Sequence, residues 1–239
     1  MRRFFCDSII EQTAVIAGDD AHHIARVLRM KTGDSLSLCD GCGREYAAEI
    51  CIISPDSVTC KLGTAAVSDA ESPCRATLFQ CLPKSGKFET IVQKCTELGV
   101  FAIVPVVSAR CVVVPGNDFQ KKIDRYRRVA LEAAKQSRRA MVPEVLPLTK
   151  ISDVDPRAFN LFLIAYEEEA TLSLKAALRQ VERPESVALL IGPEGGLEAA
   201  EVDRLTEKGA VPVSLGKRIL RTETAGMAML AQVQYEVEP

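Results

Sequence analysis

Short apolar runs alternate with longer, periodic segments over the C-terminal two thirds of the chain. Runs typical of buried strands occur at residues 76–82, 101–107, 159–165 and 187–191. Between the first two runs, residues 87–98 carry apolar side chains at helical spacing. A strand, a helix and a second strand in succession indicate a parallel α/β sheet with right-handed crossovers.

The first 70 residues have a different pattern, which predicts a small and mostly β unit. We expect a helix capped by Asp19 or Asp20, with Ile24, Val27 and Leu28 on its inner face. Strand-like alternation follows on both sides of the dipeptide at residues 40–41, which is Asp-Gly. That dipeptide is a strong hairpin signal.

A small, polar segment separates the two patterns. Residues 68–73 read Ser-Asp-Ala-Glu-Ser-Pro, a composition typical of a linker. We therefore expect two domains, at residues 1–70 and 74–239. A chain of 239 residues is long enough for both to bury a core.

Bulk composition narrows the class of protein. With 47% hydrophobic and 26% charged residues, the composition is that of an ordinary globular protein. No apolar run is long enough to span a bilayer, and the N-terminus lacks the apolar region of a signal peptide, so a cytoplasmic location is expected. The nine cysteines are odd in number and scattered, which favours reduced thiols.

One cysteine pair has the spacing of a metal or redox motif, Cys39-Asp-Gly-Cys42. A zinc site would need a second ligand pair, and only the isolated Cys51 and Cys60 follow. A redox pair would need a helix N-terminus, whereas this one lies on the predicted hairpin turn. We expect no metal ion.

The net charge of −2 hides a basic segment. Residues 121–139 contain eight basic side chains against two acidic ones, on a helix predicted at about residues 118–137. Its predicted buried stripe consists of Phe119, Ile123, Tyr126, Ala130 and Ala133. A basic face of this kind is either the footprint of a nucleic-acid partner or only a solvated surface.

Two glycine-rich junctions near the end of the chain carry the strongest signal. The run at 187–191 breaks into Gly-Pro-Glu-Gly-Gly at 192–196, and a helical pattern follows. The run at 211–215 breaks at Gly216, before a small-residue helix that begins near Ala225. Glycine lets the backbone approach a ligand closely, and parallel sheets bind ligands at the carboxyl ends of their strands. The two junctions are therefore candidate walls of one pocket.

These motifs carry a family resemblance. Gly-Pro-Glu-Gly-Gly at 192–196 and Leu-Gly-Lys-Arg-Ile-Leu-Arg-Thr-Glu-Thr-Ala at 215–225 resemble the closing region of the ribosomal small-subunit methyltransferase E family, within the SPOUT superfamily. The helical segments at 22–29 and 87–99 are similar to the same family. The resemblance implies an α/β fold, with a SPOUT-type parallel sheet and C-terminal trefoil knot after a small PUA-like β-barrel domain that holds RNA.

The resemblance also implies an activity. Members of that family transfer a methyl group from S-adenosyl-L-methionine to N3 of a uridine in 16S rRNA of the small ribosomal subunit, and their sites are completed in a homodimer. The chain has no G-x-G-x-x-G after a first strand. It therefore lacks the sequence fingerprint of Rossmann-type methyltransferases and of nicotinamide dehydrogenases. Two rivals stay open: a related enzyme that methylates a ribose 2′-hydroxyl, and an RNA-binding protein that has lost methyl transfer.

Candidate site residues follow from the motifs. Uracil N3 carries a proton, so we expect Arg221 to stabilise the anion and Glu223 or Glu194 to accept the proton. Each glutamate also has a structural alternative, as a helix cap or a support of the glycine loop. The expected cofactor-binding residues are Leu190, Gly192, Gly195, Gly196, Leu215, Gly216, Ile219, Leu220 and Thr224. The expected RNA-binding residues are His22, Arg26, Arg29, Lys84, Lys87 and Arg139.

The sequence departs from the family pattern at the end of the basic helix. The usual Glu-Gln-x-Gly-Arg is replaced by Lys135-Gln-Ser-Arg138-Arg139. If the family glycine permits a left-handed turn, Arg138 must adopt that turn at a cost, or the turn is different here.

Overall fold

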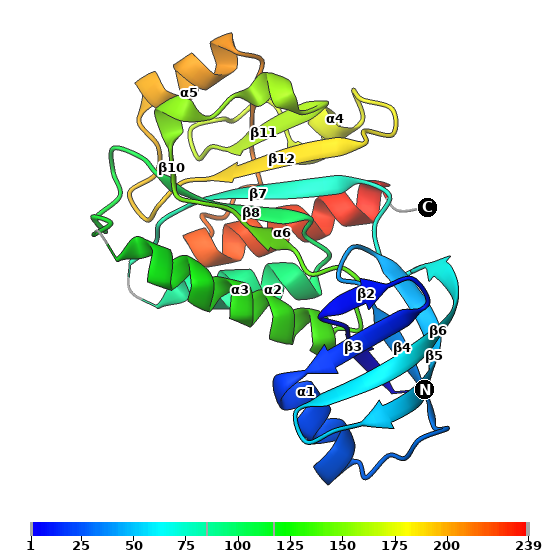
Figure 1. Ribbon diagram of the computed structural model, residues 1–239. Helices are drawn as coiled ribbons and strands as arrows, with labels where there is room; N and C mark the ends of the chain where they lie inside the picture. Colours follow the sequence, from blue (N-terminus) through cyan, green and yellow to red (C-terminus); the bar gives the residue numbers. More distant parts are fainter. Residues whose placement is uncertain (1, 85, 117, 238–239) are drawn as a thin grey trace. The chain divides into compact units, whose positions relative to one another are not determined.

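The computed structural model describes residues 2–84, 86–116 and 118–237, and the chain divides into two compact units (Figure 1). The N-terminal unit comprises residues 1–71 together with 134–142. The C-terminal unit comprises residues 72–133 and 143–239. The boundary between the two units, at residues 71 and 72, lies inside the polar segment 68–73. Residues 134–142 also belong to the N-terminal unit, and no sequence pattern predicted this.

The N-terminal unit is built on a mainly antiparallel sheet in the order β1-β4-β5-β6-β3-β2, in which β1 pairs with β4 in parallel. Its strands are β1 (Arg3–Phe5), β2 (Ser8–Ile10), β3 (Thr13–Ala17), β4 (Ser35–Cys39), β5 (Arg44–Ile53) and β6 (Ser57–Val67). Alternate residues point into one core, where Ile16, Leu36, Leu38 and Ile50 are fully buried.

The predicted Asp-Gly hairpin is confirmed. β4 and β5 pair antiparallel, with Leu38 opposite Tyr46. The Asp40 carboxylate accepts the backbone N–H groups of Cys42 at 2.7 Å and Arg44 at 3.0 Å, and Gly41 has a φ of 76°. The aspartate therefore closes the turn, and the glycine supplies its left-handed residue.

The early helix differs from the expectation in two respects. It begins with α1 (Gly18–His22) after Ala17, and neither Asp19 nor Asp20 forms a side-chain cap. The chain then continues as the π-helix η1 (His23–Val27). Because a π-helix has more residues per turn, the apolar stripe changes phase: Ile24 is fully buried, but Val27 is 62% exposed.

The C-terminal unit contains the predicted parallel sheet, in the order β10-β8-β7-β12-β11-β13, with β9 also beside β8. Its strands are β7 (Arg75–Cys81), β8 (Ala102–Val107), β9 (Glu144–Val145), β10 (Thr149–Lys150), β11 (Leu161–Ala165), β12 (Ser186–Ile191) and β13 (Val211–Val213). The central strands are buried on both faces, which explains why they read as continuous apolar runs.

Helices cover both faces of this sheet (Figure 1). They are α2 (Lys87–Glu97), α3 (Phe119–Gln136), α4 (Leu174–Leu178), α5 (Ala199–Glu207) and α6 (Thr222–Val237), with short 3₁₀ turns at Ile151–Asp153 and Pro156–Ala158. α6 packs against α2, β7 and β12, whereas Val202 and Leu205 of α5 join the core on the opposite face. The trefoil knot stays a prediction, because the order of strands in a sheet does not show whether the C-terminal segment passes through a loop of the chain.

The basic helix is confirmed as α3, and all five residues of its predicted stripe are buried. Its exposed face carries Lys121, Lys122, Arg125 and Arg128. Beyond its end, Arg138 has a φ of 62°, so this arginine adopts the left-handed turn in which the family has glycine.

No helix within the described ranges is long and apolar enough to cross a membrane. Across residues 2–84, 86–116 and 118–237, no three His, Cys, Asp or Glu side chains are grouped as metal ligands would be. The nine cysteines are free thiols.

Candidate functional site

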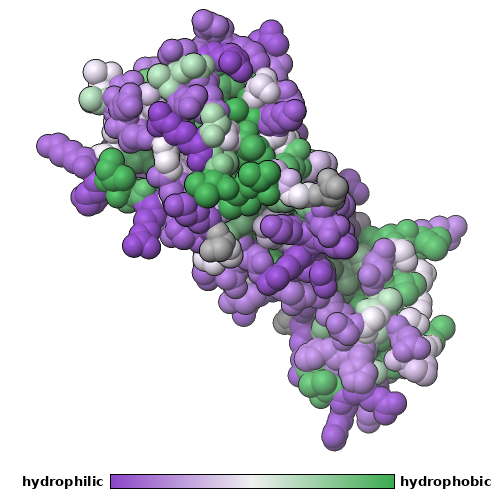
Figure 2. Space-filling model, turned by 90° about the vertical axis from the view of Figure 1, so that its left-hand side faces the viewer, coloured by the Kyte–Doolittle hydropathy of each residue, from purple (hydrophilic) through white to green (hydrophobic). Residues whose placement is uncertain are grey.

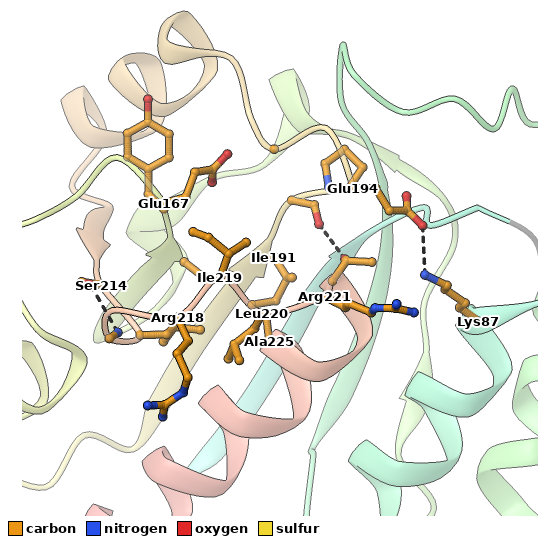
Figure 3. A pocket seen from close by; sticks show the side chains of 18 residues that line it. Lys87, Glu167, Ile191, Glu194, Ser214, Arg218, Ile219, Leu220, Arg221 and Ala225 are labelled. Atoms are coloured by element: carbon orange, nitrogen blue, oxygen red, sulfur yellow. Dashed lines mark hydrogen bonds and ion pairs between the residues drawn. The ribbon is translucent and has the colours of Figure 1, made fainter.

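A cavity of about 460 Å³ opens at the carboxyl ends of β11, β12 and β13, beside the start of α6 (Figure 3). Both glycine-rich junctions reach it, since its wall includes residues of the loop after β12 and of the loop after β13. Its lining consists of Lys87, Ala165, Tyr166, Glu167, Ile191, Gly192, Pro193, Glu194, Gly196, Ser214, Leu215, Gly216, Arg218, Ile219, Leu220, Arg221, Thr222 and Ala225.

Most of the expected cofactor-binding residues lie in this wall. Those that line the cavity are Gly192, Gly196, Leu215, Gly216, Ile219 and Leu220. Leu190, Gly195 and Thr224 do not line it. Leu190 is fully buried in the core on the α5 side of the sheet, and the next residue, Ile191, faces the cavity instead. Successive side chains of a strand point to opposite faces, which explains this displacement by one residue.

The glycines of the first loop make room chiefly for the protein itself. A Cβ on Gly192 would lie 3.2 Å from the Leu197 side chain, and one on Gly195 would lie 3.4 Å from Arg110. A Cβ on Gly196, which has a φ of 70°, would overlap the Glu167 carboxylate. The loop is therefore folded tightly on its neighbours, and this packing fixes the path of its backbone along the cavity wall.

A buried hydrogen-bond chain ties this loop to the centre of the sheet. The Thr222 hydroxyl donates to the Gly192 carbonyl oxygen at 2.7 Å and accepts from the Gln80 side-chain amide at 2.8 Å. Gln80 belongs to β7 and Thr222 opens α6, and both are buried. Three separate segments thus hold one another in place at the cavity wall.

An ion-pair cluster lies at one end of the cavity, where β7 and β12 lead to different sides of the sheet. The Lys87 ammonium lies 3.1 Å from Glu223 and 3.4 Å from Glu194, and the backbone N–H of Lys84 donates to Glu194 at 3.0 Å. Such a point, where neighbouring strands connect in opposite directions, is a usual ligand site in open α/β sheets.

Both glutamates are held in their charged form. Burial opposes ionisation of Glu194, but its own backbone amide, the Lys84 amide and the Lys87 ammonium together lower the pKa of Glu194. The pKa of Glu223 is lowered in the same way, against burial, by its own backbone amide, by Lys87 and by the nearby Arg221. A carboxylate with a lowered pKa is a weak proton acceptor, which argues against the expected general-base role of either residue.

Arg221 is differently placed. It lines the cavity, it is exposed, and its guanidinium has no hydrogen-bond or ion-pair partner within the described parts of the chain. Figure 3 shows it beside Lys87 and Glu194. Its fixed fork of donors is therefore available to an anionic ligand.

The expected RNA-binding residues separate into three groups. His22, Arg26 and Arg29 are exposed on the N-terminal unit, and Lys84 is exposed on the C-terminal unit, so all four are accessible to a partner. Lys87 belongs to the cavity.

Arg139 is the exception, because its side chain is only 3% exposed and its guanidinium pairs with Glu71 at 2.7 Å. The Glu71 carboxylate also accepts the N–H groups of residues 140 and 141. This burial argues against the expected RNA contact and gives Arg139 a structural role within the N-terminal unit.

Several residues that line the cavity were not predicted from the sequence. Ile191, Thr222 and Ala225 line the cavity and were not expected to do so, although the periods of strand and helix would have indicated them. Residues 165–167 come from the end of β11, whose position beside β12 is not visible in the sequence.

Comparison with known proteins gives consistent matches along the chain. A family profile described as RNA methyltransferase domain matches residues 70–234, and one described as RNA methyltransferase PUA domain matches residues 16–63. Ribosomal RNA small subunit methyltransferase E from Bacillus subtilis is 36% identical over 250 residues, which cover 100% of this chain and 98% of that protein.

Two similar solved structures contain a bound cofactor. Ribosomal RNA small subunit methyltransferase E from Neisseria gonorrhoeae, bound to S-adenosyl methionine, has a TM-score of 0.79 at 30% identity and covers 98% of this chain and 97% of its own. A putative methyltransferase from Legionella pneumophila, in complex with the cofactor SAM, has a TM-score of 0.80 at 29% identity, with coverage of 98% and 96%.

Proposed function

The chain belongs to the ribosomal RNA small subunit methyltransferase E family, and from this premise we propose that it transfers a methyl group from S-adenosyl-L-methionine to N3 of a uridine in 16S rRNA. The coarser activity, methylation of small-subunit rRNA, follows from family membership. The observation that favours N3 of a uridine is the pair of cations, Arg221 and Lys87, at one end of the glycine-walled cavity.

The cavity suits the cofactor in size and lining. Its volume of about 460 Å³ is within the usual range for small-molecule sites, and its wall combines apolar side chains with glycine backbone. We propose that Leu215, Ile219 and Leu220 bury the adenine, and that the backbone of Gly192 and Gly216 provides polar contacts. When bound, the cofactor supplies an activated methyl group that needs no further electrophilic help.

The acceptor is the more difficult partner in this reaction. A neutral uracil must lose its N3 proton, and the charge that develops spreads onto the two neighbouring carbonyl oxygens. We assign stabilisation of that charge to the Arg221 guanidinium, assisted by the Lys87 ammonium. Because both neighbouring glutamates have lowered pKa values, the proton leaves to solvent, and the glutamates position Lys87.

We assign substrate binding to exposed polar and basic side chains on each unit. His22, Arg26 and Arg29 lie on the PUA-like unit, and Lys84 and the exposed face of α3 lie on the methyltransferase unit. Contacts from lysine and arginine to phosphate position RNA without reading its sequence. Binding of this kind should weaken steeply as salt is raised.

We further propose a cytoplasmic homodimer. The surface is mainly hydrophilic, yet apolar side chains gather on parts of it (Figure 2). Within the C-terminal unit Tyr235 is 86% exposed, Val114 86% and Ile219 82%. Exposed apolar side chains that gather into a contiguous patch favour a protein partner. Light scattering should give the mass of two chains, and a monomeric mass would contradict the dimer.

The decisive experiment identifies the methylated atom. The purified protein is incubated with labelled S-adenosyl-L-methionine and unmodified small ribosomal subunits, and the digested rRNA is examined by mass spectrometry. We expect 3-methyluridine. A 2′-O-methyl nucleoside would retain the fold and cofactor but change the acceptor, and binding of RNA without label would favour a non-catalytic protein.

A further inference from the structure

One acidic side chain in the cavity has no assigned task. Glu167 is the second residue after β11, which ends at Ala165, and it lines the cavity together with the loop after β12. Its carboxylate lies against the backbone of Gly196, at a place where any larger residue would overlap it. Figure 3 shows Glu167 on the side of the cavity near Ile219 and away from Lys87.

The neighbouring carboxylates Glu168, Glu169 and Glu194 have internal partners, whereas Glu167 has none among residues 2–84, 86–116 and 118–237. Glu168 accepts from the Tyr166 hydroxyl at 2.9 Å, and Glu169 accepts from the backbone N–H of Leu172 at 2.9 Å. Glu194 is engaged by Lys84 and Lys87. No hydrogen bond or ion pair involves the Glu167 carboxylate in the described parts of the chain. An unpaired carboxylate in a ligand cavity is an open acceptor, with room for two donors.

Two groups of the proposed cofactor could donate to a carboxylate, namely the ribose hydroxyls and the amino-acid ammonium. The position of Glu167 favours the ribose. It borders the apolar wall, where Ile219 and Leu220 would bury the adenine, and the ribose is bonded directly to that base. Two hydroxyls on adjacent carbons match the two acceptor oxygens of one carboxylate, and acidic residues bind ribose in this way in dinucleotide sites.

We propose that Glu167 is a specificity-determining residue that accepts hydrogen bonds from the ribose hydroxyls of S-adenosyl-L-methionine. Gly196 contributes to this arrangement, because the Glu167 carboxylate occupies the space that a Cβ atom on Gly196 would fill. This inference rests on the proposed function, since it presumes that the cofactor occupies the cavity. It assigns a task to the segment after β11, which carries none of the sequence motifs.

Calorimetric binding tests the proposal without any turnover. The protein is titrated with S-adenosylhomocysteine, with 5′-methylthioadenosine, which lacks the amino acid, and with the 2′-deoxy form of 5′-methylthioadenosine. The wild-type chain should bind methylthioadenosine about ten- to one-hundredfold more tightly than its 2′-deoxy form, the usual range for a hydrogen bond to a charged group. Glu167→Gln removes the charge and one acceptor oxygen, so it should lose about tenfold of that preference, although its amide oxygen can still accept one hydrogen bond.

The matched control is Glu168→Gln, the next residue in the chain. Its amide oxygen can still accept from the Tyr166 hydroxyl, and Glu168 does not line the cavity. This variant should keep the wild-type preference for the 2′-hydroxyl. A thermal melt of each variant shows that its fold is intact.

Three results would overturn the inference. If Glu167→Gln weakens the binding of S-adenosylhomocysteine but not that of methylthioadenosine, the carboxylate pairs with the amino-acid ammonium instead of the ribose. If Glu167→Gln retains the full 2′-hydroxyl preference of the wild-type chain, the Glu167 carboxylate does not contact the ribose, while the proposed function still stands. If the wild-type chain binds neither S-adenosylhomocysteine nor methylthioadenosine, the proposed cofactor site is wrong and the inference fails with it.

Discussion

The Nζ atom of Lys87 lies 3.1 Å from Oε2 of Glu223, and this contact joins the first turn of α2 to the first turn of α6. The same ammonium lies 3.4 Å from Glu194, in the loop after β12. One cation therefore compensates two carboxylates from different segments at the end of the cavity. Because both carboxylates have lowered pKa values, they stay charged and are weak proton acceptors.

Lys87→Met should remove this compensation and leave two carboxylates facing an anionic acceptor. The expected result is a fall in kcat of about a hundredfold, the usual cost of removing one stabilising donor, with nearly unchanged affinity for S-adenosylhomocysteine. The control is Lys94→Met in the same helix, because Lys94 pairs with Glu97 and does not line the cavity. Equal losses in the two variants would contradict the role of Lys87.

Arg221→Ala should lower kcat by about a hundred- to a thousandfold, because the guanidinium is the open donor pair at this end of the cavity. Arg221→Lys should restore only a small part of the rate, since an ammonium lacks the fixed fork. Single-turnover methylation measures the effect, with Lys217→Ala as a control in the same loop but outside the cavity lining. Full activity of Arg221→Ala would remove Arg221 from the mechanism.

Thr222→Val replaces the hydroxyl with a methyl group of similar size. The Gly192 carbonyl loses this donor, and the Gln80 amide keeps only the Cys81 carbonyl as acceptor. Leaving buried polar groups unsatisfied should lower the free energy of unfolding by about 1–3 kcal/mol and weaken cofactor binding. Urea unfolding and calorimetry measure the two effects. Thr222→Ser keeps the hydroxyl, so it should stay close to wild type, and an equal loss in both variants would assign the effect to packing.

The sequence predicted the parallel sheet, the hairpin and the basic helix, because each depends on local periodicity or turn chemistry. It predicted Leu190 in the cavity wall, where the structure has Ile191. The motif shows where the strand ends, but it does not show which face of the strand points toward the cavity. It missed Glu167 for a different reason. That residue reaches the cavity only because β11 lies beside β12, and strand order is a property of the whole sheet.

Charge was a poor guide to exposure. Arg139 belongs to a basic segment that we expected to meet RNA, yet it is buried against Glu71, a residue 68 positions earlier. Nothing local to either residue predicts that pairing. Arg138, by contrast, was flagged by the missing glycine of the family pattern, and its left-handed backbone agrees with that reasoning.

Arg138→Gly should stabilise the protein. A residue with a side chain pays about 1–2 kcal/mol for the left-handed conformation, and glycine avoids this cost but loses part of the gain to its more flexible unfolded chain. We expect a net gain of about 1 kcal/mol in the free energy of unfolding, measured with urea. The control is Arg128→Gly in the middle of α3, which should lose about 1 kcal/mol. Destabilisation by Arg138→Gly would mean that the Arg138 side chain contributes more to the free energy of unfolding than its left-handed backbone conformation costs.

Cys111 should be the most reactive of the half-buried and buried thiols at neutral pH. The Cys81 thiol donates to its sulfur, and this contact, together with the Ser108 hydroxyl and amide, outweighs burial and lowers the pKa of Cys111 to about 6. Burial alone raises the pKa of Cys95 to about 12. Since the thiolate is the nucleophile, alkylation of Cys111 by iodoacetamide should rise as pH increases through about 6 and then level off, whereas Cys95 stays unlabelled.

Peptide mass spectrometry over a pH series gives the rate at each cysteine. Cys81→Ala removes the main donor, so the pH of half-maximal labelling at Cys111 should move upward, and Ser108→Ala should move it upward by less, because the Ser108 backbone amide remains. An unchanged pH profile in Cys81→Ala would show that the Cys81 contact does not stabilise the thiolate. The neighbouring Arg110 donates to the Gly195 carbonyl at 3.1 Å, so alkylated protein should also bind S-adenosylhomocysteine less tightly.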